Sequence, residues 1–205
     1  MRPPGRSYSA SGFRRLYLLA LSALASLGTH AQSDVNETRS AQIKAAYLRH
    51  LAGYAEWPKG TFETLRHPIV IAIVGKDPNE VGPLLAQAVE ERMLSAAGLE
   101  LKVKLLPAPP PPGKPLPPCH LIFLTENAVL NWKDWKKALE GKPVLTVSEK
   151  QGFAKEGGMV EFTMMPGNAR RVSIRLAINV VASAKARLKI SSRLLGLPGV
   201  KLVQP

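Results

Sequence analysis

The side chains that most often perform chemistry are few in this sequence, and their spacing forms no recognisable site. His50, His67, His120 and the single cysteine, Cys119, are the main candidates for nucleophile, base or metal ligand beyond the N-terminal segment. Nothing in the spacing of the histidines indicates that they converge on a metal. Cys119 and His120 are neighbours in an expected strand, so their side chains should point to opposite faces of a sheet. We therefore expect no metal and no Cys–His pair, a buried and inert Cys119, and a structural His120.

Sequence motifs of common catalytic and nucleotide-binding sites are also missing. The chain contains no HExxH, GxSxG or CxxC motif. The segment VGKDPNEVG places a glycine after an expected strand, but it matches neither GxGxxG nor a Walker loop. We predict no cofactor and no enzymatic activity. A hydrolase with an unrecognised site is the least favoured function class, because no nucleophile–base spacing is visible.

The N-terminal segment has the pattern of an export signal. Four arginines, Arg2, Arg6, Arg14 and Arg15, precede a short apolar run at residues 16–27, and Ala31 offers a small residue for cleavage. The run is too short to span a bilayer, which requires about 20 apolar residues. We therefore expect residues 1–31 to be a cleaved signal peptide that sends the protein to the periplasm, with an uncleaved anchor as the alternative. Residues 32–39 would then be a flexible segment.

Positive charge predominates in the chain. It has 28 basic and 15 acidic residues, and removal of residues 1–31 would leave 24 basic residues and a net charge of +9. An exported protein does not meet nucleic acid, so its acidic partners would be anionic lipid headgroups, surface polymers or an acidic protein face. Solubility alone is the simpler explanation, because the charge is scattered, with small clusters at Lys133, Lys136 and Lys137 and at Arg170 and Arg171.

Apolar segments alternate between strand and helix spacing along the rest of the chain. This order predicts a single α/β domain at residues 40–200, with a mixed, mostly parallel sheet of about six strands flanked by helices. A proline-rich surface loop at residues 107–118 and a tail at 201–205 complete the division of the chain. We expect strands at 69–75, 99–105, 119–124 and 143–147, a β-hairpin from 160–164 and 172–176, and helices at 40–54, 80–94, 127–140, 177–188 and 191–195.

A small-ligand site is one functional alternative. In open α/β sheets, ligands bind beyond the carboxyl ends of the parallel strands. Polar side chains follow the expected strands at Asn79, Thr125, Glu126 and Ser148. A periplasmic solute-binding module would use these residues.

Several segments, in order, resemble the YfiR (YfiR/HmsC-like) family of periplasmic regulators. They are AAYLRHLAGYAEWP at 45–58, IAIVGKDP at 71–78, CHLIFL at 119–124, VLTVSEKQGFAKEGGMVEF at 144–162, and IN at 178–179 followed by LKISSRLLGL at 188–197. The resemblance implies a small α/β protein, commonly a homodimer, that binds the periplasmic sensor domain of an inner-membrane diguanylate cyclase. Repression of that cyclase would limit cyclic-di-GMP signalling and biofilm formation.

The sequence departs from that family in its cysteines. Well-known members carry several cysteines, whereas this chain has Cys119 alone. Ala72 stands where the resemblance implies the partner of Cys119, and Phe153-Ala154 stands where relatives can have another cysteine. A disulfide switch within one chain is therefore excluded.

By analogy with the family, we hypothesise that part of the hairpin region binds the partner. Two glycines before a strand allow close approach by another backbone, and alternating apolar residues could form a face. The residues are Gly157, Gly158, Met159, Val160, Phe162, Ile174 and Leu176. The alternative is that these side chains belong to the core, and burial in the structure distinguishes the two.

Overall fold

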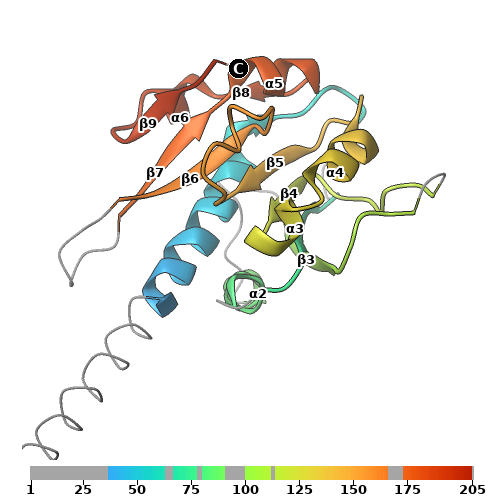
Figure 1. Ribbon diagram of the computed structural model, residues 1–205, viewed down its shortest axis with the longest axis horizontal. Helices are drawn as coiled ribbons and strands as arrows, with labels where there is room; N and C mark the ends of the chain where they lie inside the picture. The colour runs from blue at the N-terminus through green and yellow to red at the C-terminus, as the bar shows by residue number, and fades with distance from the viewer. Residues whose placement is uncertain are drawn as a thin grey trace, which may run out of the picture.

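A seven-stranded mixed sheet organises the protein (Figure 1). The computed structural model describes residues 37–62, 67–77, 80–90, 100–111, 114–165 and 173–204. Neighbouring strands are parallel except β6 and β7, which form the antiparallel hairpin, so the predicted fold class is confirmed. The strand order is β3 (Leu101–Leu106), β2 (Ile69–Val74), β4 (Leu121–Leu124), β5 (Leu145–Ser148), β6 (Val160–Met165), β7 (Ser173–Ile178) and β9 (Val200–Leu202).

Helices cover both faces of the sheet, as the apolar sequence of β2 requires. Ile71 and Ile73 pack in one core cluster with the first helix, residues 37–54, and with α2 (Val81–Glu90). Ala72 and Val74 point the other way and pack in a second cluster with α3 (Glu126–Val129) and α4 (Trp132–Leu139). A strand buried on both faces needs two covers, because successive side chains alternate between faces.

The C-terminal elements return the chain to the sheet. Strand β7 leads into α5 (Val180–Lys185), and α6 (Ser192–Leu195) precedes β9. A second sheet of two short antiparallel strands pairs β1 (Ala55–Glu56) with β8 (Lys189–Ile190). This ladder joins the end of the first helix to the C-terminal region.

Some element boundaries differ from the sequence predictions. The expected helix at 127–140 is two helices, interrupted at Leu130 and Asn131, where Asn131 leaves the helical region at φ −99° and ψ 26°. The interruption leaves Leu130 84% exposed and lets Trp132 and Trp135 face the sheet. The expected helix at 177–188 begins only at Val180, because β7 continues to Ile178.

The ends of the described region are more ordered than the sequence division suggested. Helix is present from residue 37, inside the segment expected to be flexible. Strand β9 includes Lys201 and Leu202 from the expected tail, and it pairs with β7. The expected signal peptide lies outside the described residues. Within the described ranges, no helix combines the length and the apolar character needed to cross a membrane.

A buried ion pair fastens the first helix to the end of β5. The Lys44 ammonium contacts the Glu149 carboxylate, and their side chains are only 4% and 19% exposed. Two charges removed from water stabilise one another, but either one left alone in such a site carries a large desolvation cost.

Removal of one member of this pair should therefore cost more than removal of both. We expect Lys44→Met to lower the free energy of unfolding by about 3–5 kcal/mol, because Glu149 would be left partly buried without its cation. The double variant Lys44→Met/Glu149→Leu should recover most of that loss. Urea denaturation followed by circular dichroism measures both, with exposed Lys102→Met as the control. Equal losses in the single and double variants would contradict the prediction.

Candidate functional site

The side chains that are most able to react or to bind a metal lie far from one another, or they already make contacts within the fold. The part of the chain that the structure describes contains no group of three or more His, Cys, Asp or Glu side chains that could hold a metal. Cys119 is buried as expected, and burial raises its pKa to about 11. The thiol is therefore protonated at neutral pH, which makes it a poor nucleophile and a poor metal ligand.

His120 belongs to an aromatic cluster at the amino ends of β2 and β4. Its ring lies 4.8 Å from Phe62, 5.9 Å from His67 and 6.2 Å from Trp57, measured between centroids. The Val70 backbone N–H donates to the ring atom His120 Nδ1 at 2.9 Å, and the His120 backbone N–H donates to the Val70 carbonyl at 2.8 Å. The imidazole thus extends the pairing between the two strands, and it does so only while Nδ1 carries no proton.

The predicted ligand-pocket residues do not converge on an open site. The Thr125 hydroxyl donates to the Val74 carbonyl at 2.8 Å, and the Ser148 hydroxyl donates to the Leu124 carbonyl at 2.8 Å. Both side chains are buried, whereas Glu126 is exposed. Asn79 lies outside the described residues. Thr125 and Ser148 therefore satisfy backbone groups at the strand ends instead of facing a solute.

A small crevice does exist near these strand ends. It has a volume of about 300 Å³ and is lined by Lys76, Asn127 and Asn131 among others. It lies at the carboxyl ends of β2 and β4, where the strand order reverses: the chain passes from β2 to β3 on one side and then from β3 across to β4 on the other. Open α/β sheets bind ligands at such points. Gly75 closes one wall at φ +89°, and a Cβ there would lie 2.7 Å from Thr125 Oγ1.

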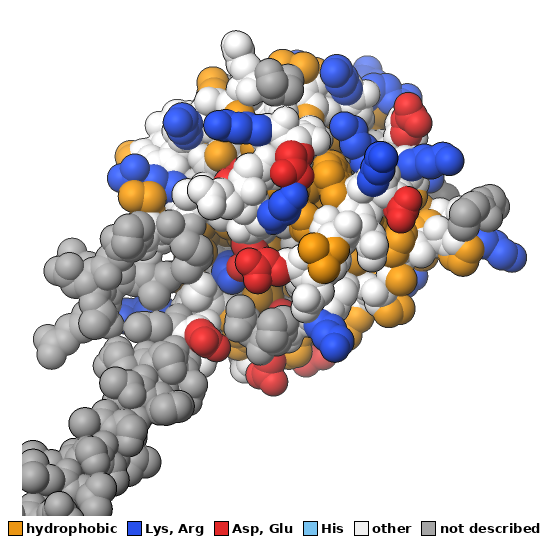
Figure 2. All heavy atoms as spheres, viewed as in Figure 1, with side chains coloured by type: hydrophobic (Ala, Val, Ile, Leu, Met, Phe, Trp, Pro, Cys, Tyr) orange, Lys and Arg blue, Asp and Glu red, His pale blue; other side chains and the backbone are white. Residues whose placement is uncertain are grey.

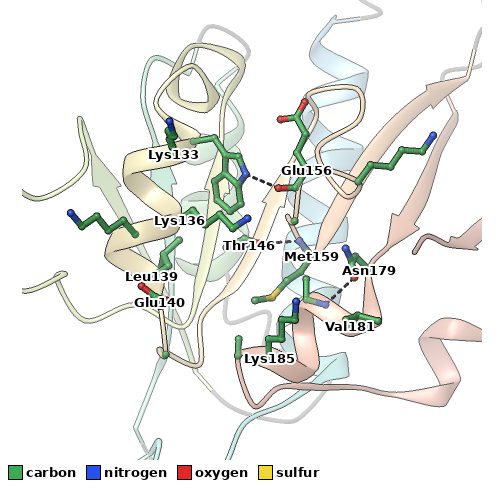
Figure 3. A pocket seen from close by; sticks show the side chains of 17 residues that line it. Lys133, Lys136, Leu139, Glu140, Thr146, Glu156, Met159, Asn179, Val181 and Lys185 are labelled. Atoms are coloured by element: carbon green, nitrogen blue, oxygen red, sulfur yellow. Dashed lines mark hydrogen bonds between the residues drawn. The ribbon is translucent and has the colours of Figure 1, made fainter. Parts of the chain in front are cut away.

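A hollow larger than this crevice is the groove between α4, the turn at residues 151–159 and α5. Its volume is about 690 Å³ (Figure 3). Apolar side chains, including Trp132, Leu139 and Met159, lie at its base and walls. Five lysines surround it: Lys133, Lys136 and Lys137 on α4, Lys155 on the turn, and Lys185 on α5. In the space-filling view, Lys and Arg side chains gather on this face around a hollow with hydrophobic side chains at its base (Figure 2).

A buried carboxylate holds the turn that forms one wall of the groove. Glu161 is 7% exposed, and its two oxygens accept hydrogen bonds from the Gly152 and Ala154 N–H groups, each at 3.1 Å. The Asn179 side-chain amide donates to the Ala154 carbonyl at 2.7 Å, and its carbonyl oxygen caps α5 by accepting from Ala182 N–H. The turn is therefore fixed to β6 and to α5 at once.

Further contacts fix the position of the same turn. The Trp132 indole N–H donates to the Glu156 carbonyl at 3.3 Å, and the Met159 N–H donates to Thr146 Oγ1 at 3.1 Å (Figure 3). Gly158 lies directly against the Phe153 ring, where an added Cβ would come within 2.2 Å of a ring atom. Only glycine fits at this position without displacing Phe153, so the double glycine has a packing role.

The structure separates the predicted partner-binding residues into two groups. Gly157 and Met159 line the groove. The other apolar side chains that can be placed are in the core, which is the alternative given above: Val160, Phe162, Ile174 and Leu176 are each between 0% and 7% exposed. The apolar face of the hairpin is therefore covered by the first helix and its neighbours.

The sequence alone did not predict that the residues lining the groove lie together. The three α4 lysines were visible as a cluster, but no periodicity connects them with Lys155 or Lys185, which come from separate elements. Two signals were available: Glu161 is an isolated acid in an otherwise apolar strand, and Asn179 is a good helix cap directly before VVASAK.

Comparison with known proteins identifies one family. A family model described as YfiR/HmsC-like matches residues 41–198, which is most of the chain. No curated protein matches the sequence. The match runs from the first helix to α6, so it includes every strand of the large sheet except β9 and every element that surrounds the groove.

Loss of the Glu161 charge should loosen the turn. In Glu161→Gln the side chain can accept one of the two N–H groups but not both, so we expect a loss of about 1.5–3 kcal/mol in the free energy of unfolding. Glu156→Gln is the matched control, because its ion pair with Lys150 is exposed and should contribute less than about 1 kcal/mol. Chemical denaturation compares the two, and equal effects would contradict the assigned role.

His120 should make stability depend on pH. Burial, with a smaller effect from neighbouring His67, lowers its pKa from 6.5 to about 4. Between these two pKa values, His120 binds a proton in the unfolded chain but not in the folded chain. Its contribution to the free energy of unfolding is therefore complete above pH 6.5 and is lost as the pH falls toward 4. The expected slope is at most about 1.4 kcal/mol per pH unit.

The matched test is the variant His120→Gln, which keeps an oxygen acceptor for Val70 N–H. Urea denaturation at pH 7, 5.5 and 4.5 should give a shallower pH dependence for the variant than for the wild type. The two proteins differ only at position 120, so the difference between their pH profiles reports the contribution of His120 and its contacts. Parallel pH profiles would show that His120 is not responsible.

Proposed function

Because this chain belongs to the YfiR/HmsC-like family, whose members are periplasmic regulators acting through protein partners, we propose that it represses an inner-membrane diguanylate cyclase. Repression would occur by binding of the cyclase's periplasmic sensor domain. Cyclic-di-GMP would then stay low, and biofilm formation would be limited. The family match over residues 41–198 is the observation that carries this proposal.

The state of the reactive side chains supports binding over catalysis. The Cys119 thiol has a raised pKa, and the hydroxyls of Thr125 and Ser148 are committed to backbone carbonyls. His120 Nδ1 accepts a backbone N–H. None of these groups is free to attack a substrate or to take a proton from one.

The proposal includes a periplasmic location for the mature protein. The basic and apolar pattern of residues 1–31 supports a cleaved signal peptide and a mature protein in the periplasm. A cyclase makes cyclic-di-GMP on the cytoplasmic side, so a periplasmic repressor can reach it only through the part of the enzyme that extends across the membrane.

Binding of a small ligand is the second candidate function. The 300 Å³ crevice at the carboxyl ends of the parallel strands favours it, because Lys76 and Asn127 supply a cation and an amide beside an apolar wall. A ligand there could act together with a protein partner. A rise in melting temperature with added solute would support this function.

Deletion of the gene should raise cellular cyclic-di-GMP. We expect the full-length chain to restore the low level, whereas a version starting at Gln32 with a new initiator methionine should not, because it would remain in the cytoplasm. Mass spectrometry of extracted nucleotide measures the effect. An unchanged level in the deletion strain, or full restoration by the leaderless version, would contradict the proposal.

A further inference from the structure

We propose that the groove between α4, the turn at 151–159 and α5 is the docking site for an acidic amphipathic segment of a protein partner. The inference rests on the proposed function only for the identity of that partner. Its chemistry follows from the charge, the floor and the rigidity of the groove itself.

Lysines outnumber acidic side chains on the rim of the groove. Five lysines and two glutamates, Glu140 and Glu156, line the groove. The ion pairs of the described part of the chain join Lys44 to Glu149 and Lys150 to Glu156, so they include none of the five groove lysines. Lys150 neutralises Glu156, which leaves Glu140 as the acid that faces these lysines. An electropositive concavity of this kind attracts an acidic partner and speeds its association.

The floor of the groove is apolar, which distinguishes a peptide from a simple anion. Leu139, Met159 and Ala186 lie at the base with 7–8% exposure, and Val181 is 40% exposed at the edge. Apolar side chains inserted there would be removed from water, at roughly 25 cal/mol per Å² buried. A phosphate or a lipid headgroup has no apolar group to place in the hollow, so it would contact the lysines alone.

The walls of the groove are held in position before any partner arrives. Glu161 and Asn179 fix the turn, and Trp132 on α4 donates to the Glu156 carbonyl across the groove. Gly157, at φ +95°, leaves space for Lys136, because an added Cβ would lie 3.0 Å from Lys136 Nζ. A site that needs little ordering loses less free energy on binding.

These features fit a helix that lies in the groove. Apolar residues at positions i, i+3, i+4 and i+7 would enter the hollow, and flanking Asp and Glu would meet the lysines on both walls. Because the lysines are exposed, the ionic part of the affinity should fall as salt is added.

The test uses the mature chain, labelled with ¹³C at the methionine methyl groups, and a designed acidic peptide with Leu at these helical positions and Glu elsewhere. A scrambled peptide of the same composition and phosphatidylglycerol vesicles are the comparison probes. We expect the helical peptide to shift the Met159 methyl signal saturably, and the scrambled peptide to bind about tenfold more weakly. Equal binding of both peptides, or a shift with the vesicles alone, would overturn the proposal.

Charge reversal separates the groove from overall charge. Lys136→Glu/Lys185→Glu changes two groove lysines, and Lys102→Glu/Lys201→Glu changes two exposed lysines elsewhere by the same total charge. The groove variant should weaken peptide binding by about tenfold or more and the control by less than about twofold, in line with the strength of exposed ionic contacts. Equal losses would mean that net charge alone attracts the peptide, and the proposal would fail.

The same variants applied to the purified periplasmic domains of the inner-membrane diguanylate cyclases distinguish this inference from the proposed function. If no such domain binds the wild type while the peptide still binds in the groove, the proposed function fails and the inference stands. If a cyclase domain binds and the groove variant binds it as tightly as the wild type, the inference fails and the proposed function stands.

Discussion

The hydrogen bonds of the buried Glu161 carboxylate are the interaction on which the basic groove depends. A carboxylate enclosed by protein requires hydrogen-bond donors, and the backbone of the turn at 151–159 supplies two of them. Asn179 then connects this turn to the start of α5. One wall of the basic groove is therefore anchored to the sheet from which Glu161 projects, although it consists of irregular backbone.

In the described part of the chain, the groups that could react and the groove that could hold a partner are separate. Its reactive groups serve the fold: Thr125 and Ser148 satisfy strand ends, His120 extends a ladder, and Cys119 is buried. The groove, in contrast, presents lysines from separate elements around an apolar floor. Charged side chains around a hollow select a binding partner by complementary charge and shape, which suits a regulator better than a catalyst.

Much of the fold was predictable because its signals are local. Strand β2 is a continuous apolar run between turn residues, and the hairpin alternates in both arms, so their strand character follows from the sequence. The pairing of β1 with β8 was not predictable, because each strand has two residues and exists only where distant segments meet. Likewise, nothing near Lys155 or Lys185 in the sequence indicates that they share a groove with α4.

The β1–β8 ladder also constrains how this protein can acquire its structure. It pairs residues 55–56 with residues 189–190, and the Lys44–Glu149 contact spans 105 positions. Loops of this length close slowly, because the entropy of bringing their ends together is lost before the contacts form. The first helix therefore cannot be secured until nearly the whole polypeptide has emerged from the machinery that makes or translocates it. If the chain crosses the membrane through a translocation channel, as proposed above, these two contacts can form only after residues 149 and 189–190 have reached the far side.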